Sequence, residues 1–267
     1  MTYEQPRGSF DMGRIMQRTF SVLGENLGQF AALAFICVAV PQGVIAALSL
    51  FLAQAAGQGG ATEGVYLITV ALGLVGGIAS MVGAYLLEAG VLYAAVSGMN
   101  GRKVTLGQMV STGFGFILPL FGLGILMGLA LVLGFALLLV PGIIMAVAWI
   151  AAAPAIVIER KGITESFGRS ADLTRNHRWA IFALCLIYSV VYMAVTFVVM
   201  ALTGGLTAAV GATSDLASLG AVTNILISPL VSAALTLIGT TGVAAIYFEL
   251  RSSKEGVGAR ELAAVFE

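Results

Sequence analysis

The residues best suited to bind a charged ligand lie in one short connector, residues 158–179, which reads IERKGITESFGRSADLTRNHRW. This connector holds five of the thirteen Lys and Arg residues and the single His of the chain. Guanidinium and ammonium groups bind phosphate oxygens, and tryptophan is typical of a membrane–water interface. We predict that anionic lipid headgroups, or a protein partner on the cytoplasmic side, bind to Arg160, Lys161, Arg169, Arg175, Arg178 and Trp179. The alternative is a solvated loop whose positive charge only orients the chain.

A second set of candidates lies inside long apolar stretches. Glu88 is an ionisable group in the apolar run 65–97, and such a group within a membrane helix suggests a function. It would also need no special role if the helix leaves the hydrocarbon just before it. The last apolar stretch carries a small polar residue at every fourth position, where the side chains either bond between helices or line a polar path. These residues are Asn224, Ser228, Ser232, Thr236 and Thr240.

Signatures of catalysis are missing from the sequence. His177 is the only histidine, so neither a multi-histidine metal site nor a Ser-His-Asp triad can be built. No GxxxxGKS or GxxxxGKT phosphate-binding loop occurs. We therefore expect no enzymatic activity, no bound metal and no cofactor.

The composition indicates the kind of structure that must position these residues. Of the 267 residues, 59% are hydrophobic and only 10% are charged, against about 25% charged in a typical soluble domain. The mean hydropathy is +1.02, and a net charge of zero argues against nucleic acid as a partner. We predict an all-α, polytopic membrane helical bundle, because six stretches are long enough to cross a bilayer. They lie near 27–53, 65–97, 116–139, 142–158, 179–202 and 222–250.

The basic residues predict the orientation of the bundle. All thirteen fall in residues 1–26, in the second and fourth connectors between the predicted spans, or in the tail. With six spans, these segments all lie on the same side of the membrane. Loops rich in Lys and Arg stay in the cytoplasm. We therefore expect a cytoplasmic amphipathic arm (1–26), a transmembrane domain (27–250) and a cytoplasmic tail (251–267). We also expect the first helix to remain as a membrane anchor. Two isolated cysteines and the lack of a glycosylation sequon fit a bacterial inner membrane.

Amphipathic segments precede the first, third and fifth predicted spans. Apolar residues recur at helical spacing in 12–23, 105–110 and 163–174, with charged residues on the other side. We expect these segments to lie flat at the headgroups on the cytoplasmic side. The pattern predicts three units, each a surface helix followed by a membrane hairpin. It is explained either by duplication or by the general similarity of such leading helices.

Three passages resemble a known family. They are Pro141-Gly142-Ile-Ile continuing to Trp149 and Pro154, then Ser170-x-x-Leu173-Thr174-x-Asn176-x-Arg178-Trp179, and finally Tyr247-Phe248-Glu249-Leu250-Arg251. Together they resemble the bacterial glycerophosphoryl diester phosphodiesterase membrane domain. The resemblance implies a membrane domain without the catalytic domain that gives the family its name. That catalytic domain needs histidines and a cluster of acidic metal ligands, so no activity is carried over.

The sequence supports two hypotheses about function. The first is a non-enzymatic inner-membrane protein that binds lipid or a partner protein through its cytoplasmic interfacial helices. The alternative is a small-solute transporter or lipid-translocating protein that uses Glu88 and the polar residues of the last helix. A polar cavity at membrane depth that touches Glu88 would favour the alternative, whereas a packed, dry bundle would favour the first hypothesis.

Overall fold

The computed structural model describes residues 10–59, 63–209 and 214–255, and within these it forms helices and no strand. The side chains of residues 53, 55–59, 65, 203–209 and 214–224 lie outside the description. In chain order the helices are α1 (Met12–Glu25), α2 (Leu27–Ala34), the π-helix η1 (Phe35–Ala39), α3 (Val40–Gly59), α4 (Glu63–Met99), α5 (Leu106–Leu137), α6 (Leu139–Ala148), α7 (Ala152–Glu159), α8 (Ile163–Thr174), α9 (Arg178–Ala209) and α10 (Ser214–Glu255).

Six of the described segments are long and apolar enough to span a membrane, which confirms the predicted polytopic helical bundle. The third begins about ten residues earlier than predicted, because Thr105 caps α5 and its side chain accepts a hydrogen bond from the Gln108 backbone N–H. The six segments are Leu27–Leu52, Tyr66–Met99, Leu106–Leu137, Leu139–Glu159, Arg178–Leu202 and Ile225–Glu255.

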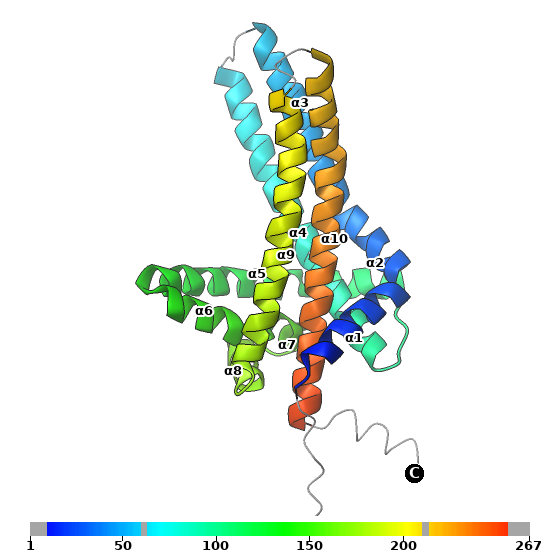
Figure 1. Ribbon diagram of the computed structural model, residues 1–267, viewed down its shortest axis with the longest axis vertical. Helices are drawn as coiled ribbons and strands as arrows, with labels where there is room; N and C mark the ends of the chain where they lie inside the picture. Colours follow the sequence, from blue (N-terminus) through cyan, green and yellow to red (C-terminus); the bar gives the residue numbers. More distant parts are fainter. Residues whose placement is uncertain (1–9, 60–62, 210–213, 256–267) are drawn as a thin grey trace, which may run out of the picture.

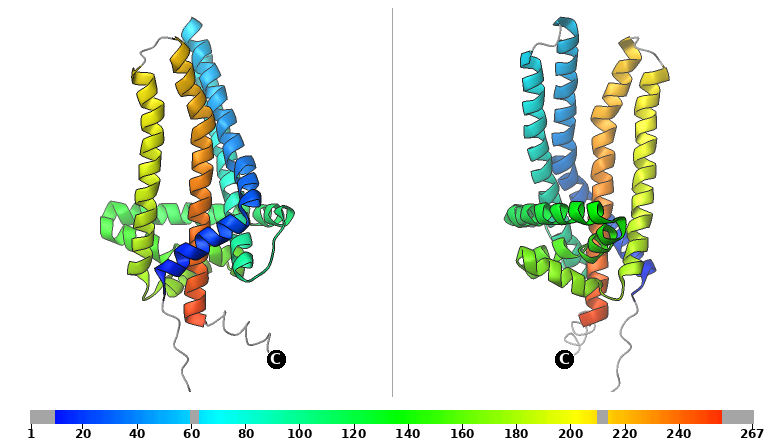
Figure 2. Two further views of the ribbon diagram at one scale, coloured as in Figure 1. Left: turned by 45° about the vertical axis from the view of Figure 1, so that its right-hand side comes forward. Right: turned by 90° about the vertical axis from the view of Figure 1, so that its left-hand side faces the viewer.

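The long helices do not all run in one direction. Helices α3, α4, α9 and α10 follow the long axis of the molecule, whereas α5 and α6 run crosswise to them and project to one side (Figure 1). The two further views show the same crosswise arrangement (Figure 2). α3 meets α4 and α9 meets α10 at one end of the long axis, which we call the loop end. α1 and α8 pack against α10 near the other end, which we call the basic end.

Close contact between backbones fixes the crossing of α4 and α5. A β-carbon built on Gly113 of α5 would lie 2.7 Å from the carbonyl oxygen of Leu86, and one built on Gly90 of α4 would lie 3.0 Å from that of Met109. Only glycine allows this approach. By contrast, Gly73 and Gly77, which form a GxxxG pair in the sequence, face open space.

The predicted helix over 142–158 is interrupted at residues 149–151, between α6 and α7. Pro154 lies in the first turn of α7, where proline is tolerated; in a continuous helix it would lack an N–H donor and clash with the preceding turn. The backbone groups at the break are satisfied by Ser170 of α8, whose hydroxyl accepts from the Ala151 N–H (3.0 Å) and donates to the Ala148 carbonyl (2.8 Å). A fully buried serine thus joins α8 to the interrupted helix.

The predicted surface helices before the first and fifth spans form as α1 and α8. Asp11 caps α1, and Ile15, Thr19 and Val22 form its buried side, as the spacing predicts. The predicted segment before the third span has no helix of its own, because α5 is continuous from Leu106. The first and third units are therefore alike, each with a surface helix and an upright hairpin, while the middle unit is a crosswise hairpin.

Candidate functional site

A pocket of about 720 Å³ opens at the basic end, where three helices meet. Its walls come from the last turns of α4, the first turns of α5, and the end of α7 with the residues that follow. Apolar side chains, including Val96, Phe116 and Ile156, form one part of the wall. The other part is polar and consists of Tyr93, Ser97, Asn100, Ser111, Thr112, Arg160 and Lys161. The pocket therefore offers a basic, hydroxyl-rich mouth beside an apolar surface.

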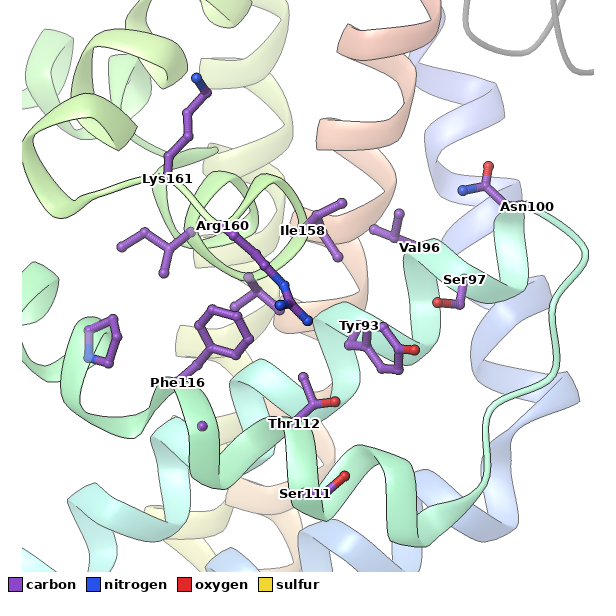
Figure 3. Close-up of a pocket in the computed structure, with 14 residues that line it drawn as sticks. Tyr93, Val96, Ser97, Asn100, Ser111, Thr112, Phe116, Ile158, Arg160 and Lys161 are labelled. Carbon is purple, nitrogen blue, oxygen red and sulfur yellow. The ribbon is translucent and has the colours of Figure 1, made fainter.

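Arg160 is held at this pocket by an unusual backbone conformation. It ends α7 with φ at 53°, in the left-handed region that normally favours glycine, and the following N–H, of Lys161, bonds to the Ala155 carbonyl. A non-glycine residue in this conformation costs on the order of 1 kcal/mol. Figure 3 shows the Arg160 side chain running into the pocket toward Thr112 and Tyr93, while Lys161 extends away from it.

The charges of Arg160 and Lys161 are not neutralised within the described part of the chain. The neighbouring Glu159 does not pair with either of them, because its carboxylate binds Arg169 and accepts a hydrogen bond from the Tyr247 hydroxyl (2.8 Å). The described ion pairs leave no carboxylate at Arg160 or Lys161. The Arg160 guanidinium beside several hydroxyls forms a surface that can receive an anion such as a phosphate group.

The other basic residues predicted to bind phosphate are placed differently. Arg169 is half-buried and pairs with Glu159 (2.9 Å) and with Glu255 of α10. Burial alone would lower the pKa of the Arg169 guanidinium, but hydrogen bonds to the two carboxylates outweigh it and raise that pKa. Arg175 and Arg178 are exposed, and the Trp179 side chain is 84% exposed. Of the six predicted residues, the structure brings only Arg160 and Lys161 to the pocket.

A cluster of charges around the end of α10 was not predicted from the sequence. Glu249 is 3% exposed and binds Arg14 (2.9 Å) and Arg18 (2.6 Å) of α1. Glu255 binds Arg169 of α8 and Arg251 of its own helix. The signal that could have revealed this cluster is an acid, Glu249, flanked by apolar residues near the end of the last span. Because its partners are distant in the sequence, the pairing itself had no local signal.

A second pocket, of about 580 Å³, lies between α1, α4, α9 and α10 and reaches Glu88. Thr236 and Thr240 line it together with Tyr188, but Ser228 and Ser232 do not. The Thr236 hydroxyl donates to the Ser232 carbonyl of its own helix (2.8 Å), not to a neighbouring helix. Glu88 is half-buried, and no cation pairs with it among the described ion pairs. Asn224 belongs to α10, but its side chain lies outside the described residues.

In residues 10–59, 63–209 and 214–255, no group of three or more His, Cys, Asp or Glu side chains is placed to hold a metal ion. His177 packs its ring against Phe10, with the ring centroids 5.0 Å apart. Neither residue lines the two pockets described above.

Comparison with known proteins places the chain in a family. Residues 13–250 match the family described as a domain of unknown function, DUF7847, and this range contains both pockets and most of the described helices. No curated protein and no solved structure shows a significant match to the chain. The resemblance to the phosphodiesterase membrane domain stays a prediction, because this match names a different family. Since the match covers most of the sequence, the chain belongs to the DUF7847 family.

Proposed function

We propose that this protein is a non-enzymatic membrane protein that binds the anionic headgroup of a membrane lipid in the pocket beside Arg160. The observation that carries the proposal is the Arg160 side chain, which runs into a hydroxyl-lined pocket without a carboxylate partner in the described chain. The backbone of Arg160 is in the left-handed region, where glycine would be less strained, so the arginine does not serve the folding stability of the chain at this position.

The mixed wall of the pocket favours a lipid over a free anion. The phosphate would lie between Arg160 and the hydroxyls of Ser97 and Thr112, while Val96 and Phe116 would contact the first carbons of the acyl chains. A basic side chain near an anionic membrane surface contributes about 1 kcal/mol of attraction, and a direct charge-assisted hydrogen bond adds to this. Free glycerophosphate shares the phosphate chemistry but not the acyl contact.

The basic residues also indicate on which side of the membrane the pocket lies. We place the protein in a bacterial inner membrane with the basic end in the cytoplasm and both termini on that side. Arg102, Lys103, Arg160 and Lys161 lie in connectors at this end, and cytoplasmic loops are the ones that carry Lys and Arg.

The test measures binding of short-chain phosphatidylglycerol to the purified full chain in a neutral detergent, with phosphatidylcholine of the same chain length as the uncharged comparison. We expect Arg160→Gly to weaken phosphatidylglycerol binding by about five- to thirty-fold, equivalent to about 1–2 kcal/mol. Glycine adopts the left-handed conformation at this position without strain, so the fold should be retained.

Arg175→Gln is the matched control, because it removes the same charge from an exposed residue outside the pocket. It should change binding by less than about two-fold. Equal loss in both variants would contradict a specific pocket and indicate general surface attraction. Competition by free glycerophosphate as strong as that by phosphatidylglycerol would contradict the lipid and identify a soluble anion.

A second candidate function is supported by the pocket at Glu88. Its lining joins an ionisable side chain to Thr236 and Thr240, although most of the wall is apolar. Such a pocket suits a transporter or a lipid-translocating protein in which the carboxyl group gains and loses a proton.

Glu88→Gln tests this second function in proteoliposomes, with proton-driven solute uptake and lipid scrambling as the two assays. If the carboxyl group takes part, the variant should lose flux while keeping its folding and its abundance in the membrane. Ile187→Val, which changes only the aliphatic part of the same pocket wall, is the control for packing. Unchanged flux in Glu88→Gln would rule out the carboxyl group.

A further inference from the structure

The crosswise direction of α5 and α6 conflicts with the simplest placement of six apolar helices in a bilayer. α5 contacts α4 at Tyr85, Leu86 and Gly90, well below the loop end, through the close approaches of Gly113 and Gly90. Helices that run crosswise to one another cannot all cross the same membrane (Figure 2). Either the upright helices or the hairpin of α5 and α6 must lie along the membrane plane.

The length of the upright helices above the hairpin decides which set crosses. From Glu63 to Tyr85, which meets Gly124 of α5, α4 contains 22 residue steps, about 33 Å of helix. In α10 we count from the start of the helix at Ser214 to Thr236, because Thr236 and Glu88 of α4 line the same pocket. This part of α10 also contains 22 residue steps. Both values match the roughly 30 Å thickness of the hydrocarbon core. The hairpin therefore lies at the level where the hydrocarbon ends on the basic side.

The side chains of the hairpin suit lipid and not water. No charged residue occurs from Val104 to Ile158. Large apolar side chains on both arms and at the turn are more than 60% exposed, which exceeds what an aqueous surface normally carries. They are Phe114, Leu118, Val132, Leu133, Leu137, Leu138, Leu139 and Val140. At the turn Leu138 alone leaves the helical conformation, and its N–H bonds to the Gly134 carbonyl (3.2 Å).

We propose that the chain crosses the membrane four times, through the rod of α2, η1 and α3, and through α4, α9 and α10. The hairpin of α5 and α6 lies at the boundary between the headgroups and the acyl chains of the cytoplasmic leaflet, and it contacts the acyl chains without reaching the other side. The basic residues that flank it, Lys103 before α5 and Arg160 after α7, then face the headgroups of the same leaflet.

The experiment measures depth along α5 in the full chain. A bimane fluorophore is attached to single cysteines at Phe114, Leu126 and Leu138, which are all exposed and span 24 residues, about 36 Å of helix. The variants are reconstituted into vesicles that contain lipids brominated at different acyl positions. Fluorophores at Tyr66 and Ile78 of α4, which are exposed and about 18 Å apart along a crossing helix, provide the calibration.

We expect the three hairpin positions to be quenched by the same shallow bromine, while the two α4 positions differ in depth. A depth that reaches the bilayer centre at Leu126 and returns to an interface at Leu138 would overturn the proposal and restore a crossing hairpin. Three positions that no lipid quenches would also overturn it, because the apolar surface would then be covered by protein, such as a second copy of the chain.

Discussion

At the scale of single residues, two buried or half-buried side chains hold the basic end together through contacts that are distant in the sequence. The Ser170 hydroxyl bonds to backbone groups at the break between α6 and α7, which are 19 and 22 residues before it. Arg169 binds both Glu159 and Glu255, and Glu255 lies 86 residues after Arg169. The sequence predicted that Arg160, Lys161 and Arg169 would act alike. It could not separate them, because the carboxylates that neutralise Arg169 come from α7 and α10.

Ser170→Ala should lower the free energy of unfolding by about 1–3 kcal/mol, because the Ala151 N–H and the Ala148 carbonyl lose a buried partner. Thermal unfolding in detergent measures the change. Ser253→Ala is the control, since that half-buried hydroxyl donates only to the Leu250 carbonyl one turn earlier on its own helix. An equal effect of the two substitutions would mean that the break between α6 and α7 does not depend on Ser170.

At the scale of elements, the end of α10 serves as the common attachment for the two surface helices. Glu249 binds α1 and Glu255 binds α8, and the ring of Phe248 lies 4.8 Å from the Arg18 guanidinium carbon. Hydropathy and helical spacing predicted α1, α8 and the long apolar helices. They did not predict the crosswise direction of α5, because periodicity reports that a segment is a helix and not which neighbour it crosses. Gly90 and Gly113 set that crossing.

Glu249→Gln should release α1 while leaving α8 in place. The buried carboxylate would lose its charge, and both Arg14 and Arg18 would lose their ion pair with α10. Hydrogen exchange, followed peptide by peptide, should become faster over residues 12–25 and stay unchanged over 163–174. Glu255→Gln is the reciprocal variant and should affect only the second range. Faster exchange over both ranges in either variant would mean that the two surface helices dock as one unit.

At the scale of the whole molecule, the two ends of the long axis differ in the helices and the charges that they carry. α3 and α9 end at the loop end, and α1, α8 and the last turn of α10 occupy the basic end. The six apolar segments and the clustering of basic residues were both readable from the sequence. The sorting of these segments into four upright helices and one crosswise hairpin required the structure, because all six have similar apolar composition.

Cysteine labelling checks this polarity. In a background with Cys37→Ala and Cys185→Ala, Gly64→Cys should react with an impermeant maleimide added outside intact cells, and Gly168→Cys should react only after the membrane is opened. Both glycines have open space around the position of an added β-carbon, so neither substitution should disturb packing. Labelling of Gly168→Cys in intact cells would reverse the orientation.

The ion pair between Arg18 and Glu249 also has a consequence for the order in which the protein is made. The two residues are 231 positions apart, so at synthesis rates of about 5–20 residues per second the arginine leaves the ribosome roughly 10–50 s before its partner. During that interval the apolar side of α1 has no helix to cover it, and the membrane surface is the cover at hand. α1 is thus synthesised well before α10 but docks only after it, and completion of α10 is the event that secures it.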